Sequence, residues 1–343
     1  MNKVIIENKQ FKVNGKQIWF NGVNTPWNKW NDFGGGYDDT WWDTHFAELS
    51  KAGVNSTRVW INCNSDNNAI EIDSQGKIGE ITANHWNDLD KFFETAKRNK
   101  IYIMATLLSF DHFQDKGERK TAAEKWRNML YNKQSAGSFA QNYVIPFVKR
   151  YDSNPYLWSI DLMNEPDWVY EVEICGKIAW EHISYLFAVC AAAIHEHGKT
   201  LVTVGMSFPK YNSSKANCEG NKVSDNFLQN LYKNRLAYLD FWSPHYYDWV
   251  GEYYGVPFYM TPEEFGMDSS KPSVIGECCA KGSAGNTIIK DYKSAFDNGW
   301  HGVMPWTSNG VDGNGDLSDL SPGTLYMFEN HRELIKGDFY GEN

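Results

Sequence analysis

The sequence contains no long apolar run, and no stretch approaches the roughly 20 apolar residues that a membrane-spanning helix needs. Its opening, MNKVIIENKQFK, lacks the apolar region of about 7–15 residues that a secretory signal peptide contains. Cations are also few, since 33 Lys and Arg stand against 43 Asp and Glu, which gives a formal net charge of −10. An acidic surface repels phosphate groups, so we expect neither nucleic acid nor a membrane as a partner.

Metal-binding and disulfide patterns are missing as well. The six cysteines form no CxxC pair and no zinc-ligand spacing, so we expect free thiols, no metal and no other cofactor. The run DGNGD at 312–316 resembles a calcium loop, but Leu317 and Gly323 stand where that loop needs Gly and Glu. We therefore expect a turn-rich loop there.

No linker, low-complexity segment or repeat of fixed period divides the 343 residues, so we expect one domain over 1–343. Short apolar segments alternate with longer helical patterns. Continuous apolar character is typical of strands buried on both faces. Eight such segments are present, at 18–23, 53–61, 100–108, 156–164, 200–206, 238–246, 272–278 and 301–307.

Helical patterns lie between these strands, at 38–53, 83–100 and 284–299 and in a run that ends near residue 198. Eight strand–helix units predict an α/β fold, a (β/α)8 TIM barrel. The segments before the first barrel strand predict a short β-hairpin that turns at Asn14–Gly15. In such a barrel, functional side chains lie where the strands end, at the C-terminal face.

Aromatic residues are abundant, because 15 Trp, 19 Tyr and 19 Phe make up 15% of the chain. Their flat rings have apolar faces and polar edges, which suits a sugar ligand. Two carboxyl groups also stand at predicted strand ends, Glu165 after the fourth strand and Glu277 after the seventh. Glycoside cleavage needs one protonated and one ionised carboxyl, so the pair predicts that chemistry. The alternative is that both are ordinary surface carboxylates.

The pattern resembles glycoside hydrolase family 5, the family of cellulases and β-mannanases. The matching pieces run in family order from residue 11 to residue 307 and cover most of the chain: FKVNGKQIWFNGVN, TRVW, LMNEP, SPHYY, IGE and MPWTS. The resemblance implies that Glu165 is the acid/base and that Glu277 is the nucleophile. It also implies that Asn164 binds the sugar 2-hydroxyl and that Trp306 forms the floor of the subsite next to the cleaved bond.

By the same resemblance, Arg58 and Tyr247 orient the nucleophile, and His245 lies near the acid/base. A charge and a hydroxyl beside Glu277 favour its ionised form, whereas Glu165 must keep a raised pKa, so we expect opposite environments for the two carboxyls. Arg58 could equally form a structural ion pair under the barrel mouth. Three tryptophans that follow strand ends are our candidates for outlying sugar subsites: Trp27, Trp168 and Trp249.

One departure from the family pattern concerns the end of the third strand. Many cellulases of the family carry Asp-x-His there, whereas this chain has LLSFDHF, with Asp111 and His112 adjacent. We assign a role to neither residue.

The leading hypothesis is a retaining, endo-acting β-1,4-glycan hydrolase on a neutral polysaccharide or oligosaccharide, with a glucan slightly ahead of a mannan. LMNEP favours a cellulase, while TRVW and the missing Asp-x-His favour a mannanase. Two alternatives from other classes are a non-catalytic glycan-binding barrel and a metal-dependent hydrolase, for which His245 is the one strand-end histidine found. We expect a monomer, and an extracellular location because a polymer is too large to enter a cell.

Overall fold

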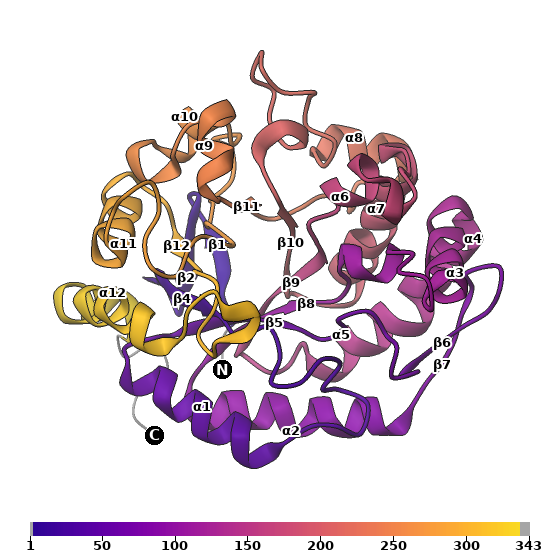
Figure 1. Ribbon diagram of the computed structural model, residues 1–343, viewed down its shortest axis with the longest axis horizontal. Coiled ribbons are helices and arrows are strands. Elements are labelled where there is room, and N and C mark those ends of the chain that lie inside the picture. The colour runs from indigo at the N-terminus through magenta and orange to yellow at the C-terminus, as the bar shows by residue number, and fades with distance from the viewer. Residues whose placement is uncertain (1–2, 337–343) are drawn as a thin grey trace.

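Parallel strands form the centre of the molecule and helices surround them (Figure 1). The computed structural model describes residues 3–336. Seven strands are hydrogen-bonded in the order β11-β10-β9-β8-β5-β4-β12. Their bounds are β4 (Phe20–Asn24), β5 (Ser56–Trp60), β8 (Tyr102–Thr106), β9 (Leu157–Asn164), β10 (Leu201–Met206), β11 (Ser243–Pro244) and β12 (Gly302–Val303).

The segment 273–277 closes this sheet between β11 and β12. It is joined to its neighbours by single parallel bridges, among them His245 to Glu277 and Ile275 to Val303. The predicted (β/α)8 barrel is therefore confirmed. The seventh predicted strand, 272–278, is present only as these alternating bridges. Its neighbour β11 is two residues long, and Pro244 and Pro272 have no N–H to donate to a longer ladder.

Helices are present at the four predicted positions, and further helices that were not predicted from the sequence follow the other strands. Those of seven residues or more are α1 (Asp39–Lys51), α2 (Ala83–Asn99), α3 (Lys120–Tyr131), α4 (Lys133–Phe139), α5 (Ile145–Tyr151), α7 (Trp180–His197), α8 (Asp225–Tyr232), α9 (Asp248–Tyr254), α11 (Ile288–Asp297) and α12 (Leu317–Asn330). The shorter ones in residues 3–336 are α6 (Asp167–Glu171), α10 (Pro262–Phe265) and α13 (Arg332–Ile335). Local capping explains the starts of the main helices, since Asp38, Thr82 and Thr287 each accept a backbone N–H of the first turn.

The predicted hairpin is present and pairs β2 (Gln10–Val13) with β3 (Lys16–Gln17) around Asn14–Gly15. Both turn residues have positive φ, +51° and +77°, as the tightest hairpin turn requires. A further strand, β1 (Ile5–Glu7), pairs with β2 on its other side. A second hairpin, β6 (Ile70–Ile72) with β7 (Ile78–Ile81), was not predicted.

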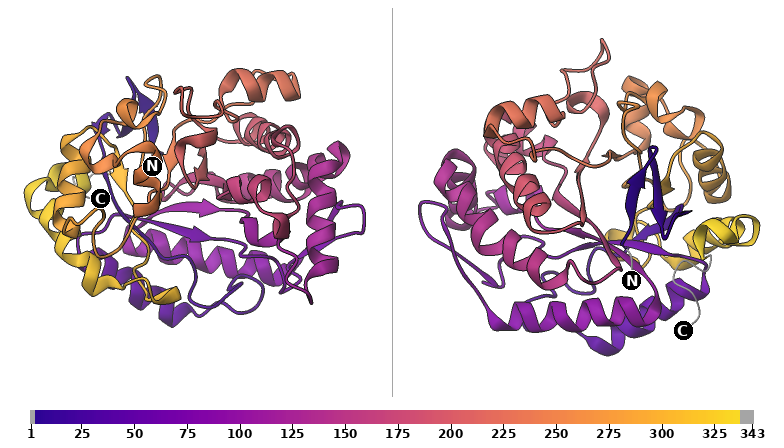
Figure 2. Two further views of the ribbon diagram at one scale, coloured as in Figure 1. Left: turned by 45° about the horizontal axis from the view of Figure 1, so that its top comes forward. Right: turned by 180° about the vertical axis from the view of Figure 1, so that it is seen from behind.

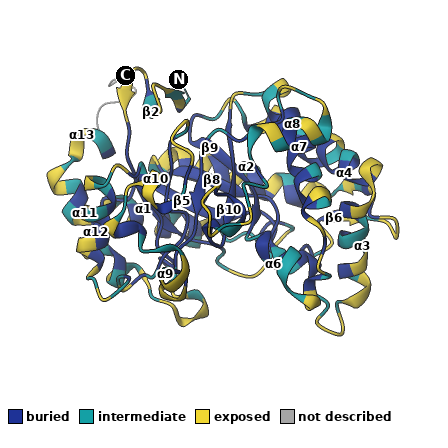
Figure 3. Cartoon of the chain, turned by 90° about the horizontal axis from the view of Figure 1, so that it is seen from above, coloured by how far each residue is buried: buried dark blue, intermediate teal, exposed yellow. Residues whose placement is uncertain are grey.

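The strands β1 to β3 lie against one end of the barrel, which faces the viewer in the right panel of Figure 2. Its Phe11 is fully buried and makes edge contacts with the rings of Phe20, Trp158 and Phe241, with centroids 5.1–5.5 Å apart. This end of the barrel is thus filled with apolar side chains, and Figure 3 shows the strands as the buried centre of the molecule. Any polar site built on the strands must open at the opposite end.

Within residues 3–336, no helix combines the length and the apolar character that crossing a membrane would take.

Candidate active site

The two predicted carboxylates meet at the C-terminal end of the barrel. Glu165 follows β9 directly and Glu277 lies in the closing segment 273–277. Although 112 positions separate them in the chain, a carboxylate oxygen of one lies within 4.8 Å of a carboxylate oxygen of the other. Both line a cavity of about 390 Å³. Its other walls are formed by Trp27, Trp30, Trp60, Phe110, Asp111, Lys116, Asn164, Tyr247, Trp306 and Asp312.

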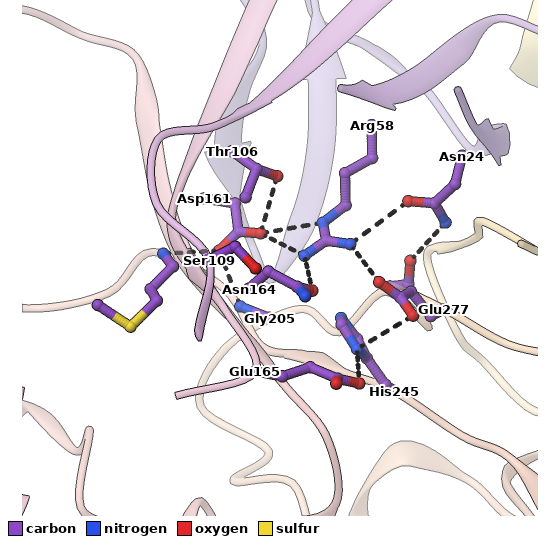
Figure 4. A network of polar contacts seen from close by, with 12 residues as sticks. Asn24, Arg58, Thr106, Ser109, Asp161, Asn164, Glu165, Gly205, His245 and Glu277 are labelled. Carbon is purple, nitrogen blue, oxygen red and sulfur yellow. Dashed lines mark hydrogen bonds and ion pairs between the residues drawn. The ribbon is translucent and has the colours of Figure 1, made fainter. Parts of the chain in front are cut away.

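Arg58 organises the floor of this cavity (Figure 4). Its Nη1 donates to Glu277 Oε1 at 2.6 Å, and its Nη2 donates to Asp161 Oδ2 at 2.6 Å and to Asn164 Oδ1 at 2.8 Å. The Arg58 and Asp161 side chains are fully buried, so each charge depends on the other for compensation. Arg58 therefore orients the nucleophile candidate and also forms the structural ion pair that the sequence left open as an alternative.

A glycine permits this arrangement at β10. A Cβ on Gly205 would lie 2.6 Å from Arg58 Nη2 and 2.8 Å from His245 Nε2, which is too close for any side chain. The carbonyl oxygen of Gly205 also accepts the Glu165 backbone N–H at 2.7 Å. That contact holds Glu165 at φ +47°, in the left-handed region that glutamate rarely adopts.

Glu165 is surrounded by neutral hydrogen-bonding groups. Trp168 Nε1 donates to Glu165 Oε2 at 2.7 Å, and His245 Nδ1 lies 2.9 Å from Glu165 Oε1. Burial raises the pKa of Glu165 to about 7, against the opposing effects of the Trp168 N–H and the Arg58 charge. Burial lowers the pKa of His245 to about 4, so its imidazole is neutral near pH 7. Glu165 is thus suited to hold a proton near neutral pH.

Glu277 has cationic and hydroxyl partners. Arg58 Nη1 contacts one oxygen, and the Tyr247 hydroxyl donates to the other at 2.8 Å. Burial raises the pKa of Glu277 as well, and Arg58 and Tyr247 oppose that rise. Burial therefore raises the pKa of both carboxyls. Glu277 differs from Glu165 in its direct contacts with Arg58 and Tyr247. These contacts favour the ionised form of Glu277.

Glu165, His245 and Glu277 also place three possible metal-ligand atoms within 4.8 Å of one another. The donor set contains one histidine and two carboxylates. The guanidinium of Arg58, 2.6 Å from Glu277, occupies the position where a cation would otherwise balance that carboxylate. The contacts of Glu277 therefore fit proton and nucleophile chemistry better than metal ligation.

Four tryptophans form one wall of the cavity. The centroid of the Trp60 ring lies 5.0 Å from that of Trp306 and 6.0 Å from that of Trp27. The centroids of the Trp27 and Trp30 rings are 4.7 Å apart. The Arg58 guanidinium stacks over Trp60 at 4.3 Å. Trp27 and Trp306 were predicted to contact a ligand, whereas Trp30 and Trp60 were not. Both could have been predicted from their positions in the sequence, since Trp60 ends the second strand and Trp30 follows the first.

The other two predicted tryptophans lie elsewhere. Trp168 Nε1 donates to the Glu165 carboxylate, because a turn of three residues brings its ring back onto Glu165, and its place in an outlying sugar subsite stays a prediction. Trp249 on α9 is 45% exposed and lies 6.1 Å from Trp168. Neither ring lines the 390 Å³ cavity.

Sequence reasoning missed Asp161 and the residues of the loops. Asp161 had a signal, because an aspartate in the middle of a buried strand requires a partner. Asp111 and His112, to which the sequence assigned no role, differ in position. Asp111 lines the cavity. His112 is fully buried, and burial lowers its pKa to about 3. Lys116 and Asp312 come from loops whose course no strand or helix pattern specifies.

Comparisons with known proteins identify the family of the chain and agree with its fold. The family model "Cellulase (glycosyl hydrolase family 5)" matches residues 11–299. The chain is 22% identical to a mannan endo-1,4-beta-mannosidase of Cryptopygus antarcticus, over 92% of the chain and 86% of that protein. It is also 22% identical to a mannan endo-1,4-beta-mannosidase of Mytilus edulis, over 93% of the chain and 91% of that protein. The crystal structure of an endo-1,4-beta-mannanase from Eisenia fetida superposes with a TM-score of 0.83 at 21% identity, over 95% of each chain.

Proposed function

The chain belongs to glycosyl hydrolase family 5 and is a glycoside hydrolase, and on this premise we propose that it cleaves internal β-1,4 bonds of a mannan backbone with net retention of configuration. The observation that carries the proposal is the pair Glu165 and Glu277. A carboxyl with a pKa near 7 stands within 4.8 Å of a carboxylate that Arg58 and Tyr247 bind. A glycan-binding barrel without turnover would need no proton donor of this kind.

The choice of mannan departs from the ranking that the sequence alone supported. LMNEP placed a glucan slightly ahead, but both long curated matches are named mannan endo-1,4-beta-mannosidases. TRVW and the absent Asp-x-His agree with them. A β-1,4-glucan is the second candidate, because the matching family model is described as Cellulase.

The proposed mechanism is a double displacement. Glu165 gives its proton to the glycosidic oxygen while Glu277 attacks the anomeric carbon, so that the bond to the leaving sugar breaks and a glycosyl ester forms. Glu165, now ionised, then takes a proton from water as the water oxygen displaces Glu277. Retaining enzymes hold their two carboxyls about 5–5.5 Å apart and inverting enzymes about 6.5–9.5 Å. The separation found here supports retention.

Substrate choice is tested by kcat/KM on galactomannan, mixed-linkage β-glucan, carboxymethylcellulose and xylan. We expect the highest value on galactomannan, with some activity on glucans. A clear preference for a glucan would replace mannan by the second candidate. Activity on xylan alone, or on none of these polymers, would refute the substrate class.

Retention is tested by following the anomeric proton of the product by NMR in the first minutes of reaction, where we expect the β-anomer first. An initial α-anomer would contradict the mechanism. Glu277→Ala should lose nearly all turnover and regain part of it with azide, which can replace a missing carboxylate nucleophile. Normal turnover of that variant would remove Glu277 from the mechanism.

A further inference from the structure

Asp111 lies on the turn that follows β8, directly beside the residue pair Asn164–Glu165. The backbone of Ser109 bridges to Asn164, and the Asn164 N–H donates to the carbonyl oxygen of Leu108 at 2.8 Å. Two residues farther along, Asp111 lines the cavity that both glutamates also line. The carboxylate thus faces the place where the cleft would hold a sugar next to the acid/base candidate.

The surrounding side chains hold Asp111 in a fixed orientation. The Ser109 hydroxyl donates to Asp111 Oδ2 at 2.7 Å. Arg119 Nη1 donates to the backbone carbonyl of Asp111 at 2.7 Å, and Arg119 Nε pairs with Asp66 Oδ2 at 2.7 Å. The turn is therefore fastened from both its side-chain and its backbone groups. A carboxylate held in this way presents its second oxygen in one direction only.

That second oxygen is unused. Asp111 Oδ1 accepts no hydrogen bond from any residue between 3 and 336, and it is not among their enclosed unpaired polar atoms, so it is an accessible oxygen on a residue that lines the cavity. A partly buried carboxylate gains from every hydrogen bond donated to it. The group that could donate is a ligand's. A neutral glycan, the ligand of the proposed function, offers hydroxyl groups, so a hydroxyl is the fitting donor.

We propose that Asp111 is a specificity-determining residue that accepts a hydrogen bond from a hydroxyl of the pyranose bound beside Glu165. Gluco- and manno-configured chains differ in the direction of one hydroxyl. A fixed acceptor bonds a hydroxyl in one direction and is left unpaired, at a cost, by the other. Asp111 therefore contributes to the choice between the two configurations. This inference rests on the proposed glycan hydrolysis and adds a residue that discriminates between substrates.

The test compares Asp111→Ala and Asp111→Asn with matched changes at Asp115, on the same loop. Within residues 3–336, the Asp115 side chain takes part in one hydrogen bond, which it accepts from the Gly117 N–H at 3.3 Å, and Asp115 does not line the cavity. We expect Asp111→Ala to lower kcat/KM about 10- to 100-fold on the preferred polymer, mainly through KM, as loss of a charged hydrogen bond does. Asp115→Ala should stay within about twofold. Asp111→Asn keeps the shape of the side chain and serves if the alanine variant does not fold.

Specificity has its own measurement, the ratio of inhibition constants of manno- and cello-oligosaccharides as competitors. Both Asp111 variants should move this ratio toward one, and the Asp115 variants should leave it unchanged. Equal weakening of both oligosaccharides, or kcat/KM within about twofold of the wild type, would overturn the proposal. If instead the wild-type enzyme fails to cleave mannan, the proposed substrate is wrong, while the comparison at Asp111 is still decided on the polymer that is cleaved.

Discussion

Arg58 pairs with two carboxylates at once, and the burial of all three side chains makes these contacts costly to break. Asp161 and Glu277 each lie 2.6 Å from the guanidinium. Asp161→Ala removes one of the two countercharges of Arg58 and both hydrogen bonds that Asp161 accepts from the buried guanidinium, so it should lower the free energy of unfolding by about 3–5 kcal/mol. The guanidinium, then held only by Glu277 and Asn164 among these partners, should also orient Glu277 less well and lower kcat.

Denaturant unfolding measures the stability loss, with Asp43→Ala as the control. Asp43 pairs with Arg98 at 2.9 Å, but both side chains are about half exposed, and such pairs contribute about 0–1 kcal/mol. Similar losses for the two variants would show that burial of the Arg58 pair does not govern its energetics.

Trp168 adjusts the proton affinity of Glu165 through one hydrogen bond. Its N–H stabilises the charged carboxylate and so lowers the pKa of Glu165, which burial sets at about 7. A general acid is active in its protonated form, so kcat/KM should fall as pH rises through about 7. Trp168→Phe keeps an aromatic ring and removes the donor, and the alkaline limb of the pH profile should therefore move to higher pH.

The profile is measured on an unactivated substrate, whose leaving group needs the proton. Trp249→Phe is the matched control, because Trp249 lies 6.1 Å from Trp168 and does not line the cavity. A shift of the limb to lower pH in Trp168→Phe would contradict the assigned hydrogen bond.

At the scale of elements, the N-terminal hairpin supports the barrel from the end opposite the active site. Phe11 is fully buried against three aromatic rings of the barrel. Phe11→Ala should lower the free energy of unfolding by about 3–5 kcal/mol, through lost burial and the cavity left behind. Because Phe11 is far from the glutamates in the fold, KM should stay near the wild-type value. Ile5→Ala, at a side chain that is 47% exposed, should change stability by less than about 0.5 kcal/mol.

The elements also show which parts of the structure the sequence determines locally. Helices α1, α2 and α11 were predictable because their apolar periodicity comes with capping side chains such as Asp38 and Thr287. The closing segment 273–277 was predicted as a regular strand, but it pairs by single bridges whose extent depends on neighbours distant in the sequence. The β6–β7 hairpin was missed because it lies inside a long loop.

In the candidate site too, residues on barrel strands could be predicted from the sequence and residues on loops could not. Glu165, Glu277 and Arg58 could be found because each ends or lies within a strand that the barrel aims at one face. Asp111, Lys116 and Asp312 enter the cavity from loops, and a loop's course is set by contacts such as Arg119 with Asp66 that leave no periodic signal. The assigned roles of the site residues remain predictions until the variants are measured.

For the molecule as a whole, the acidic charge should affect which polymers it accepts. The net charge is −10, and apart from Glu165, which holds a proton near neutral pH, the cavity is lined by three carboxylates, Asp111, Glu277 and Asp312, and one lysine, Lys116. A carboxymethylated polymer should therefore be repelled more than its neutral parent. Salt screens this repulsion, since the Debye length falls from about 30 Å at 0.01 M to about 8 Å at 0.15 M ionic strength.

We expect kcat/KM on the carboxymethylated polymer to rise several-fold over that range of sodium chloride at constant pH. The value for the neutral parent should stay within about twofold, because no charge on the substrate is screened. The neutral polymer thus controls for effects of salt on the enzyme itself. A kcat/KM on the charged polymer that falls with salt would mean that Lys116 and other cations outweigh the carboxylates at the cleft, and that the acidic charge does not reach the bound substrate.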